Sequence, residues 1–173
     1  MKPPQEAKLL REIREARTLF DRFGHTLSHR ADMARLLSLY REAIEETQNL
    51  MHQLGVAASC TACAGEEPGG CCFEGIEAGY DRILLLINLL MGCNIPDSRE
   101  IAGNCLFVGM KGCNLQARYY YCVHYFCPAL QTTLGPDAKH ELQVVVGKEL
   151  AAGWELERAL REYLIQLERT LAV

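Results

Sequence analysis

Apolar residues recur every three to four positions along the first third of the chain, with polar and charged residues between them. This spacing predicts two helices, because residues three and four apart share one face of a helix. The first apolar stripe covers residues 9–23, and Gly24 is expected to end that helix. The second helix is expected to begin near Asp32, a suitable N-cap residue, and to end at Gly55. Together the two helices would form a helical hairpin.

Two further helices are predicted later in the chain. Residues 76–91 form the third, which Gly92 ends, and its second half is apolar on nearly every side. A helix of that kind is expected to lie innermost. The last helix follows the break at Gly135 and Pro136 and carries an apolar stripe to the end of the chain.

The segment between the third and last helices, residues 93–136, lacks helical periodicity. The letters GMKG at residues 109–112 stand between two short apolar pieces and predict a small β-hairpin. The fold class predicted is therefore mostly all-α, a four-helix bundle-like scaffold with an irregular cysteine-rich insert and one small hairpin. A chain of 173 residues with 49% hydrophobic content is expected to form a single domain over residues 1–173.

The charge and hydropathy of the chain argue against two classes of binding partner, nucleic acids and membranes. The formal net charge of −4 offers no basic surface for nucleic acid or for an anionic membrane, so neither partner is expected. The longest apolar run, residues 83–91, is too short to cross a bilayer. The first residues contain no apolar core of a secretory signal, which leads us to expect a cytoplasmic location.

The cysteines are confined to one part of the chain. All nine lie between residues 60 and 127, in the segments with the weakest packing pattern. Cysteines used as small core residues would be scattered over the helical stripes instead. The nine positions are Cys60, Cys63, Cys71, Cys72, Cys93, Cys105, Cys113, Cys122 and Cys127.

Three uses of these thiols compete. A disulfide framework suits small secreted proteins, and here the number of cysteines is odd and no export signal is visible. A redox pair would fit the two-residue spacing of Cys60 and Cys63, but no βαβ pattern surrounds them. Metal binding is favoured, because clustered thiolates are soft ligands that select zinc, copper(I) or iron–sulfur clusters. Cys60 and Cys63 are expected to hold an ion through a tight loop. Cys71 and Cys72 are expected to serve two ions or to bridge.

The order of these residues resembles a known family. A CxxC pair, a CC pair, a C…GC hairpin, an arginine and two closing cysteines are similar to the YkgJ-type cysteine-cluster family, also called the CxxCxxCC family. The resemblance covers residues 60–128. Arg118 matches the arginine of the family pattern, whereas Cys93 has no counterpart in it. It implies a zinc- or iron-chelating segment within the domain. The metal ligands it implies are Cys60, Cys63, Cys71, Cys72, Cys105, Cys113, Cys122 and Cys127.

Other residues near the cysteines have simpler explanations. Cys93 is expected to be a buried small side chain, and His124, among tyrosines, to be hydrogen-bonded without binding metal. The tyrosines of residues 119–121 are expected to pack against the bundle. Arg118 and Lys111 would be surface charges or would offset the negative charge of a thiolate site. The glutamates at 66, 67 and 74 are expected to be solvated.

The function expected from the sequence is metal binding without catalysis, in a structural or metal-handling role. Zinc is favoured over an iron–sulfur centre, because no three-cysteine run of the common cluster-binding type occurs. Cys127 followed by proline keeps the iron–sulfur centre open. The alternative is a zinc- or iron–sulfur-dependent enzyme of redox or transferase type. Some larger members of the similar family are flagellin lysine methylases, but no glycine-rich nucleotide loop occurs in this chain. Besides the metal ion, a homo-oligomer or a protein partner docking on the amphipathic helices is the other interaction considered.

Overall fold

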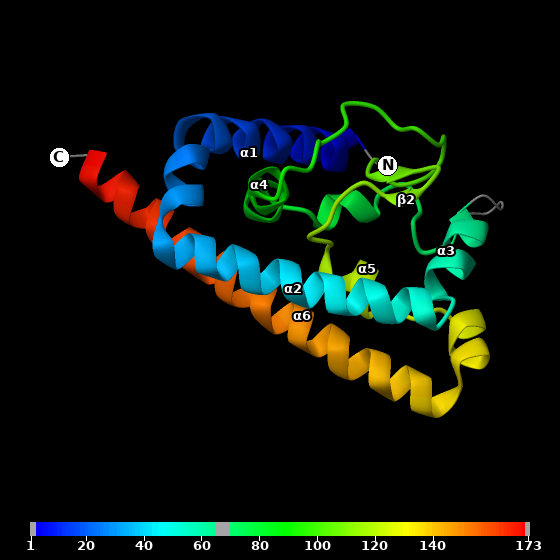
Figure 1. Cartoon of the computed structure of the whole chain (residues 1–173). Coiled ribbons are helices and arrows are strands. Elements are labelled where there is room, and N and C mark those ends of the chain that lie inside the picture. Colours follow the sequence, from blue (N-terminus) through cyan, green and yellow to red (C-terminus); the bar gives the residue numbers. More distant parts are fainter. Residues whose placement is uncertain (1–2, 65–69, 172–173) are drawn as a thin grey trace.

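The computed structural model describes residues 3–64 and 70–171 and is mostly helical (Figure 1). About 73% of the structure is helix, and its sheet is a two-stranded antiparallel hairpin, which confirms the predicted fold class. The elements in chain order are α1 (Pro3–His29), α2 (Ala31–Gln53), α3 (Val56–Ala64), the 3₁₀ helix η1 (Ile76–Gly79), α4 (Arg82–Leu90), β1 (Val108–Gly109), β2 (Gly112–Cys113), α5 (Tyr120–His124) and α6 (Pro128–Leu171).

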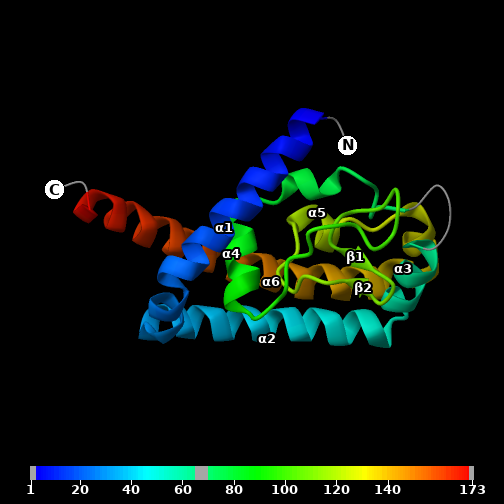
Figure 2. The ribbon, with the colours of Figure 1, turned by 90° about the horizontal axis from the view of Figure 1, so that it is seen from above.

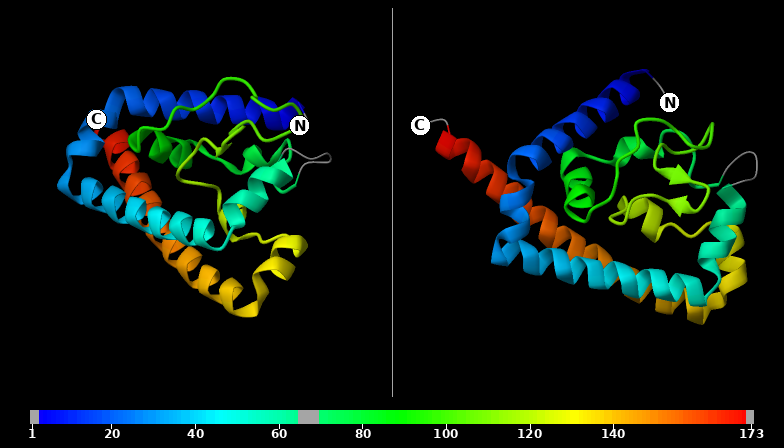
Figure 3. Two further views of the ribbon diagram at one scale, coloured as in Figure 1. Left: turned by 45° about the vertical axis from the view of Figure 1, so that its right-hand side comes forward. Right: turned by 45° about the horizontal axis from the view of Figure 1, so that its top comes forward.

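Three long helices form the frame of the molecule. α2 follows α1 directly, but α1 runs obliquely to α2 and packs mainly on α4, so the two do not lie side by side as the predicted hairpin would. α6 runs back along α2 in the opposite direction (Figures 1 and 2). The shorter α4 is seen end-on in Figure 1, so it crosses the long helices instead of aligning with them. It packs against α1 and α6. The irregular segment and the hairpin lie beside α4, toward the end of the molecule that carries α3 (Figure 3).

The core is built around α4, as its all-round apolar pattern predicts. Leu85, Leu86 and Ile87 have no exposed surface. Full burial of an aliphatic side chain of this size stabilises a fold by about 1.5–3 kcal/mol. The sequence prediction that this helix lies innermost is confirmed.

Glycine ends several helices where the sequence predicts it. Gly55 and Gly92 follow α2 and α4 with positive φ angles of 72° and 85°. Residues with a Cβ rarely adopt such angles, so glycine is favoured there. Gly135 also has a positive φ, and it kinks α6 just before Pro136. The kink confirms the predicted break, but a short helical piece from Pro128 onward precedes it, where the sequence predicted irregular structure.

Two predicted helix boundaries are wrong. α1 continues past Gly24 to His29, because a glycine inside a helix costs only about 1 kcal/mol and Leu27, beyond it, is completely buried. Asp32 lies in the first turn of α2 and is not its N-cap, a position that Arg30 occupies. The two side chains form an ion pair at 2.8 Å.

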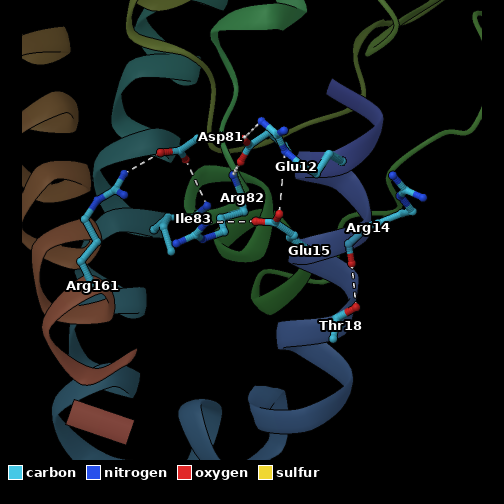
Figure 4. A network of polar contacts seen from close by, with 9 residues as sticks. Glu12, Arg14, Glu15, Thr18, Asp81, Arg82, Ile83 and Arg161 are labelled. Carbon is cyan, nitrogen blue, oxygen red and sulfur yellow. Dashed lines mark hydrogen bonds and ion pairs between the residues drawn. The ribbon is translucent and has the colours of Figure 1, made fainter. Parts of the chain in front are cut away.

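The predicted third helix is divided into η1 and α4, and Asp81 caps the second part. The Asp81 carboxylate accepts hydrogen bonds from the backbone N–H groups of Ile83 and Leu84, at 3.0 and 2.9 Å. Its other oxygen pairs with Arg161 of α6 at 2.7 Å (Figure 4). Burial alone would raise the pKa of Asp81, but these hydrogen bonds outweigh it and hold the pKa below the usual range.

The first turn of α4 is also hydrogen-bonded to α1. The Arg82 backbone N–H donates to Glu12 at 2.8 Å, and the Arg82 guanidinium donates to Glu15 at 3.0 Å (Figure 4). The start of α4 is therefore joined to both α1 and α6. In residues 3–64 and 70–171, no helix is both long enough and apolar enough to span a bilayer.

Candidate metal centre

The cysteine-bearing segments gather at one end of the molecule. α3 lies against β2, and α5 precedes the start of α6 at the same end (Figures 1 and 3). Segments that are far apart in sequence are thus neighbours in space. All nine cysteines are free thiols in the part of the chain that is described.

Cys60 and Cys63 lie on α3, and the prediction that a tight loop holds them is wrong. Three residues apart on a helix, they share one face of it. Both residues are exposed. The Cys63 sulfur packs so closely on Gly70 that a Cβ at that position would overlap it. Glycine at 70 therefore allows the chain before Cys71 to pass beside α3.

Cys71 and Cys72 lie in a bend, and residues 72–74 pair with residues 103–105. The Cys105 N–H donates to the Cys72 carbonyl at 2.8 Å, and Phe73 and Asn104 form an isolated antiparallel bridge. These contacts place the Cys72 and Cys105 backbones side by side. The predicted turn residues 65–69, with the glutamates at 66 and 67, lie outside the described residues.

The predicted hairpin follows directly. Cys113 pairs with Val108 across its two strands, and the Cys105 carbonyl accepts a hydrogen bond from the Val108 N–H at 3.1 Å. Cys105 is buried, whereas Cys113 is exposed. Lys111 lies in the turn of the hairpin and is exposed, which agrees with the prediction that it is a surface charge.

The last two cysteines lie at helix boundaries. Cys122 is half-buried within α5. Cys127 directly precedes Pro128, and its sulfur accepts a hydrogen bond from the Leu130 N–H at 3.5 Å. Cys127 thus caps the first piece of α6, with proline in the favoured first helical position.

The described thiols are close neighbours, but they do not surround a common point. Among the described residues, no three cysteine, histidine, aspartate or glutamate side chains are arranged so that they could hold one metal ion. The structure therefore brings the predicted cysteines into one region without placing them in a coordination geometry.

Burial and mutual repulsion raise the pKa of several of these thiols. Loss of solvent raises the pKa of Cys105 and of Cys122 to about 12 each, and nearby cysteines add to the shift of both. The pKa of Cys60 is raised first by surrounding protein atoms and then by the charges of Cys71 and Cys127. An opposite charge of a bound cation would reverse this effect.

Cys71 and Cys72 behave as a pair. A hydrogen bond between their sulfur groups lowers the pKa of Cys71 to about 6 and raises that of Cys72. The two thiols therefore differ in how readily each loses its proton. Cys71 is the member of the pair that gives up its proton first.

Arg118 is a positive charge that acts on several of the thiols. It lowers the pKa values of Cys60, Cys113 and Cys122, although the protein atoms around each sulfur raise these pKa values by more. Its Nε is buried and has no hydrogen-bond partner among the described residues, and its Nη2 lies 3.9 Å from the Met51 sulfur. Arg118 is thus half-buried, and its role in offsetting thiolate charge stays a prediction.

Glu149 of α6 is a buried carboxylate that sequence reasoning missed. It has no exposed surface, and neither oxygen makes a hydrogen bond of ordinary geometry. Burial raises its pKa, and the Thr47 hydroxyl and Arg118 charge oppose this in part. A signal exists in the sequence, because Glu149 occupies a position on the apolar stripe of α6, three residues after Val146.

A second missed residue, Asn88, is the polar residue in the apolar run of α4. It is fully buried and makes four hydrogen bonds, two of them to the backbone N–H groups of Gln116 and Ala117. These bonds tie α4 to the residues directly before Arg118. A lone asparagine in an apolar run was the signal that could have identified it.

An ion pair with a buried carboxylate lies next to the segment that contains Cys105. Arg99 pairs with Glu77, which has no exposed surface, and donates to the Asn104 carbonyl at 2.7 Å. Arg99 also pairs with Glu74 at 3.6 Å, so Glu74 is not simply solvated. The pairing joins η1 to the loop that leads to Cys105.

Neither His124 nor Cys93 is one of the eight predicted metal ligands. His124 is exposed and lines a cavity of about 260 Å³ with Tyr121, Tyr125 and Lys139. Cys93 packs against the core and adds to the raised pKa of Cys113.

The tyrosines divide between the core and the surface. Tyr119 packs against the buried Tyr80, with 6.1 Å between the ring centroids. Tyr120, in contrast, is 57% exposed. The expected packing of the whole run against the bundle therefore holds only in part.

Comparisons with known proteins add no relative. Neither models of known protein families, nor curated proteins, nor solved structures match this chain significantly.

Proposed function

We propose that this chain is a non-catalytic metal-binding protein that holds zinc or an iron–sulfur centre through cysteine thiolates. The observation that carries the proposal is the gathering, at one end of the molecule, of eight cysteines from α3, residues 71–72, residues 105–113, α5 and the residue before α6. This donor set is the one that zinc and iron prefer. The proposal rests on these residues and not on membership of a family.

The ligands that would hold the metal are the eight predicted ones, Cys60, Cys63, Cys71, Cys72, Cys105, Cys113, Cys122 and Cys127. The cation would replace thiol protons and so remove the repulsion that raises several of their pKa values. Arg118 would offset part of the negative charge of the thiolates. Exposed thiols at positions 60, 63 and 113 can rotate toward an ion without breaking core packing.

A non-catalytic role is favoured over the enzymatic alternative by the cavities. The larger cavity, of about 440 Å³, is lined by Tyr40, Arg118, Tyr119 and Trp154 among others, and the smaller lies around His124. No cysteine lines either of these two cavities. These two cavities therefore do not support a catalytic metal ion with a free coordination position facing a substrate.

Elemental analysis tests the proposal directly. Protein purified without oxygen is assayed for zinc, iron and acid-labile sulfide, and its visible absorption spectrum is recorded. We expect stoichiometric metal, colourless for zinc and brown for an iron–sulfur centre. A folded, fully reduced protein that contains no metal and takes up neither zinc nor iron would overturn the proposal.

Two matched variants provide the control. Cys122→Ala and Cys93→Ala each remove one half-buried thiol from the same region. We expect Cys122→Ala to lower the metal content and Cys93→Ala to leave it unchanged. Equal metal loss in both would show that general packing, and not ligation, governs metal content.

A further inference from the structure

The larger cavity, of about 440 Å³, is formed by segments that are distant in the sequence. Its lining comes from α2, the junction of η1 and α4, residues 118–120 and α6. Ligand pockets in proteins commonly have volumes of about 300–1,000 Å³, with mostly apolar walls and a few polar groups. This cavity is therefore large enough for a small organic molecule.

Four aromatic side chains line the cavity, and they are Tyr40, Tyr119, Tyr120 and Trp154. Two glycines lie between them. A Cβ on Gly79 would come within 2.6 Å of the Tyr119 ring, and a Cβ on Gly153 within 2.9 Å of the Tyr40 ring. Glycine at these two positions thus lets both rings lie against the backbone.

The other two aromatic side chains leave much of their surface in solvent. Trp154 is 61% exposed and Tyr120 is 57% exposed, although both are large and mostly apolar. A molecule bound in the cavity would cover part of this surface, and removal of apolar surface from water is favourable. A flat aromatic ligand fits such walls best, because aromatic rings also attract one another in stacked and edge-to-face arrangements.

The two acidic residues that line the cavity are already paired with a cation. Arg161 pairs with Asp81 at 2.7 Å (Figure 4) and with Glu157 at 3.1 Å. Arg158, whose guanidinium lies 5.7 Å from the centroid of the Trp154 ring, is likewise held in ion pairs with two glutamates of α6. These charges therefore balance one another without a ligand.

Arg118, in contrast, lines the cavity without an acidic partner among the described residues. Its Nε is buried and has no hydrogen-bond partner, and its Nη2 lies 3.9 Å from the Met51 sulfur, a weak acceptor. Both oxygens of the neighbouring Glu149 also lack a hydrogen-bond partner, so no direct contact neutralises the guanidinium. A ligand carboxylate would supply the missing acceptor, because it can accept two parallel hydrogen bonds from a guanidinium.

The backbone that leads to Arg118 is held in place by α4. The Asn88 side chain accepts hydrogen bonds from the N–H groups of Gln116 and Ala117 and donates to the Ala117 carbonyl at 2.8 Å. A binding group on a fixed backbone loses less conformational freedom when a ligand arrives.

We infer that this cavity binds a small aromatic carboxylate. The ring of the ligand stacks against the tyrosines and Trp154, and its carboxylate accepts hydrogen bonds from the Arg118 guanidinium. This binding goes beyond the proposed metal binding and does not depend on it, because no described cysteine lines the cavity.

3-Phenylpropanoate is a suitable probe, and 3-phenylpropanamide is its uncharged counterpart of similar shape. Trp154 is the single tryptophan of the chain, so its fluorescence reports whether the cavity is occupied. We expect phenylpropanoate to shift the emission to shorter wavelength as it covers the indole. It should bind about tenfold more tightly than the amide, or better, because only the acid forms charge-assisted hydrogen bonds with Arg118.

Two pairs of variants test the two halves of the site. Arg118→Gln is expected to abolish the preference for the acid, whereas Arg35→Gln, which removes an exposed arginine of α2, should keep it. Tyr120→Ala is expected to weaken the binding of phenylpropanoate by about threefold or more, because one aromatic wall is lost. Tyr125→Ala, which alters only the smaller of the two cavities, should leave it unchanged.

Each result supports or overturns the inference. Equal binding of the acid and the amide, or an unchanged preference in folded Arg118→Gln protein, would overturn the role of Arg118. No spectral change and no heat of binding at millimolar phenylpropanoate would overturn binding itself. Should the variants fail to fold, the acid and the amide compared on the unmodified chain decide. Metal content measured on the same samples tests the proposed function separately, since either kind of binding can fail without the other.

Discussion

Glu149 shows how a single residue can set the pH dependence of this fold. Because burial raises its pKa, the protonated carboxyl is favoured in the folded state. Stability from this group is complete below its unfolded pKa and is lost as the pH rises through the folded value. The protein should therefore lose this contribution to its stability as the pH rises above the usual range of a glutamate pKa.

Glu149→Gln removes this dependence. We expect it to raise the free energy of unfolding at pH 8 by about 1–2 kcal/mol, because a buried carboxylate without good hydrogen bonds is replaced by a neutral amide. The gain should shrink toward pH 4.5. Urea unfolding at both pH values measures it, with Glu141→Gln, an exposed residue of α6, as the control. A loss of stability at pH 8 would mean that attraction to Arg118 outweighs the burial cost.

Asn88 is a second single residue on which the stability of the fold depends, because its side chain accepts hydrogen bonds from buried backbone N–H groups. Asn88→Ala leaves the N–H groups of Gln116 and Ala117 without their acceptor. We expect a loss of about 2–4 kcal/mol in the free energy of unfolding, since each buried unsatisfied group costs about 1–3 kcal/mol. Amide hydrogen exchange at these two residues should also accelerate. The exposed Asn94→Ala is the control, and unchanged protection in the Asn88 variant would contradict the assignment.

Among the elements, α6 carries two glycines with opposite surroundings. Gly153 lies against the Tyr40 ring, and a Cβ there would come within 2.9 Å of it, whereas a Cβ at Gly147 would meet nothing within 4 Å. The close approach allows α6 to pack on α2, the helix pair that supports Thr47 and Glu149. Gly153 is thus a point of close contact between the two helices.

Alanine at these two positions should have opposite effects. Gly147→Ala is expected to stabilise the protein by about 0.5–1 kcal/mol, because alanine favours the helix. Gly153→Ala is expected to destabilise it by about 1–3 kcal/mol through crowding against Tyr40. Thermal unfolding of the two variants compares them within one helix. Stabilisation by both would show that the contact with Tyr40 yields easily.

For the whole molecule, the helical frame and the cysteine region have different sources of stability. α1, α2, α4 and α6 are held by buried apolar side chains, so the frame should survive without metal. The hairpin has two residues in each strand and would gain order from an ion, since structural zinc contributes about 10–16 kcal/mol in small peptides.

Chelation under reducing conditions should therefore loosen one part of the molecule only. We expect most helical circular dichroism to remain, while amide protection at residues 105–122 falls. Adding zinc back should restore it. Unchanged protection after complete metal removal would show that backbone and side-chain contacts alone order the hairpin.

Much of the frame could be predicted because apolar periodicity is a local property. The stripes of α1, α2 and α6, the glycine stops at 55 and 92, and the GMKG turn all match the structure. α3 was missed because its residues, rich in alanine and cysteine, show no apolar stripe. The break before Asp81 was missed because η1 continues the helical pattern of α4.

The amino-acid sequence by itself determined the donor chemistry: nine thiols, their confinement to residues 60–127 and the helices that surround them. Only the tertiary structure decided which thiols are neighbours, and it placed Cys72 beside Cys105 and Cys63 beside Gly70. It also placed the half-buried Arg118 near the buried Glu149. Helix periodicity arises within a few residues, whereas the path that joins distant segments depends on how all the helices pack.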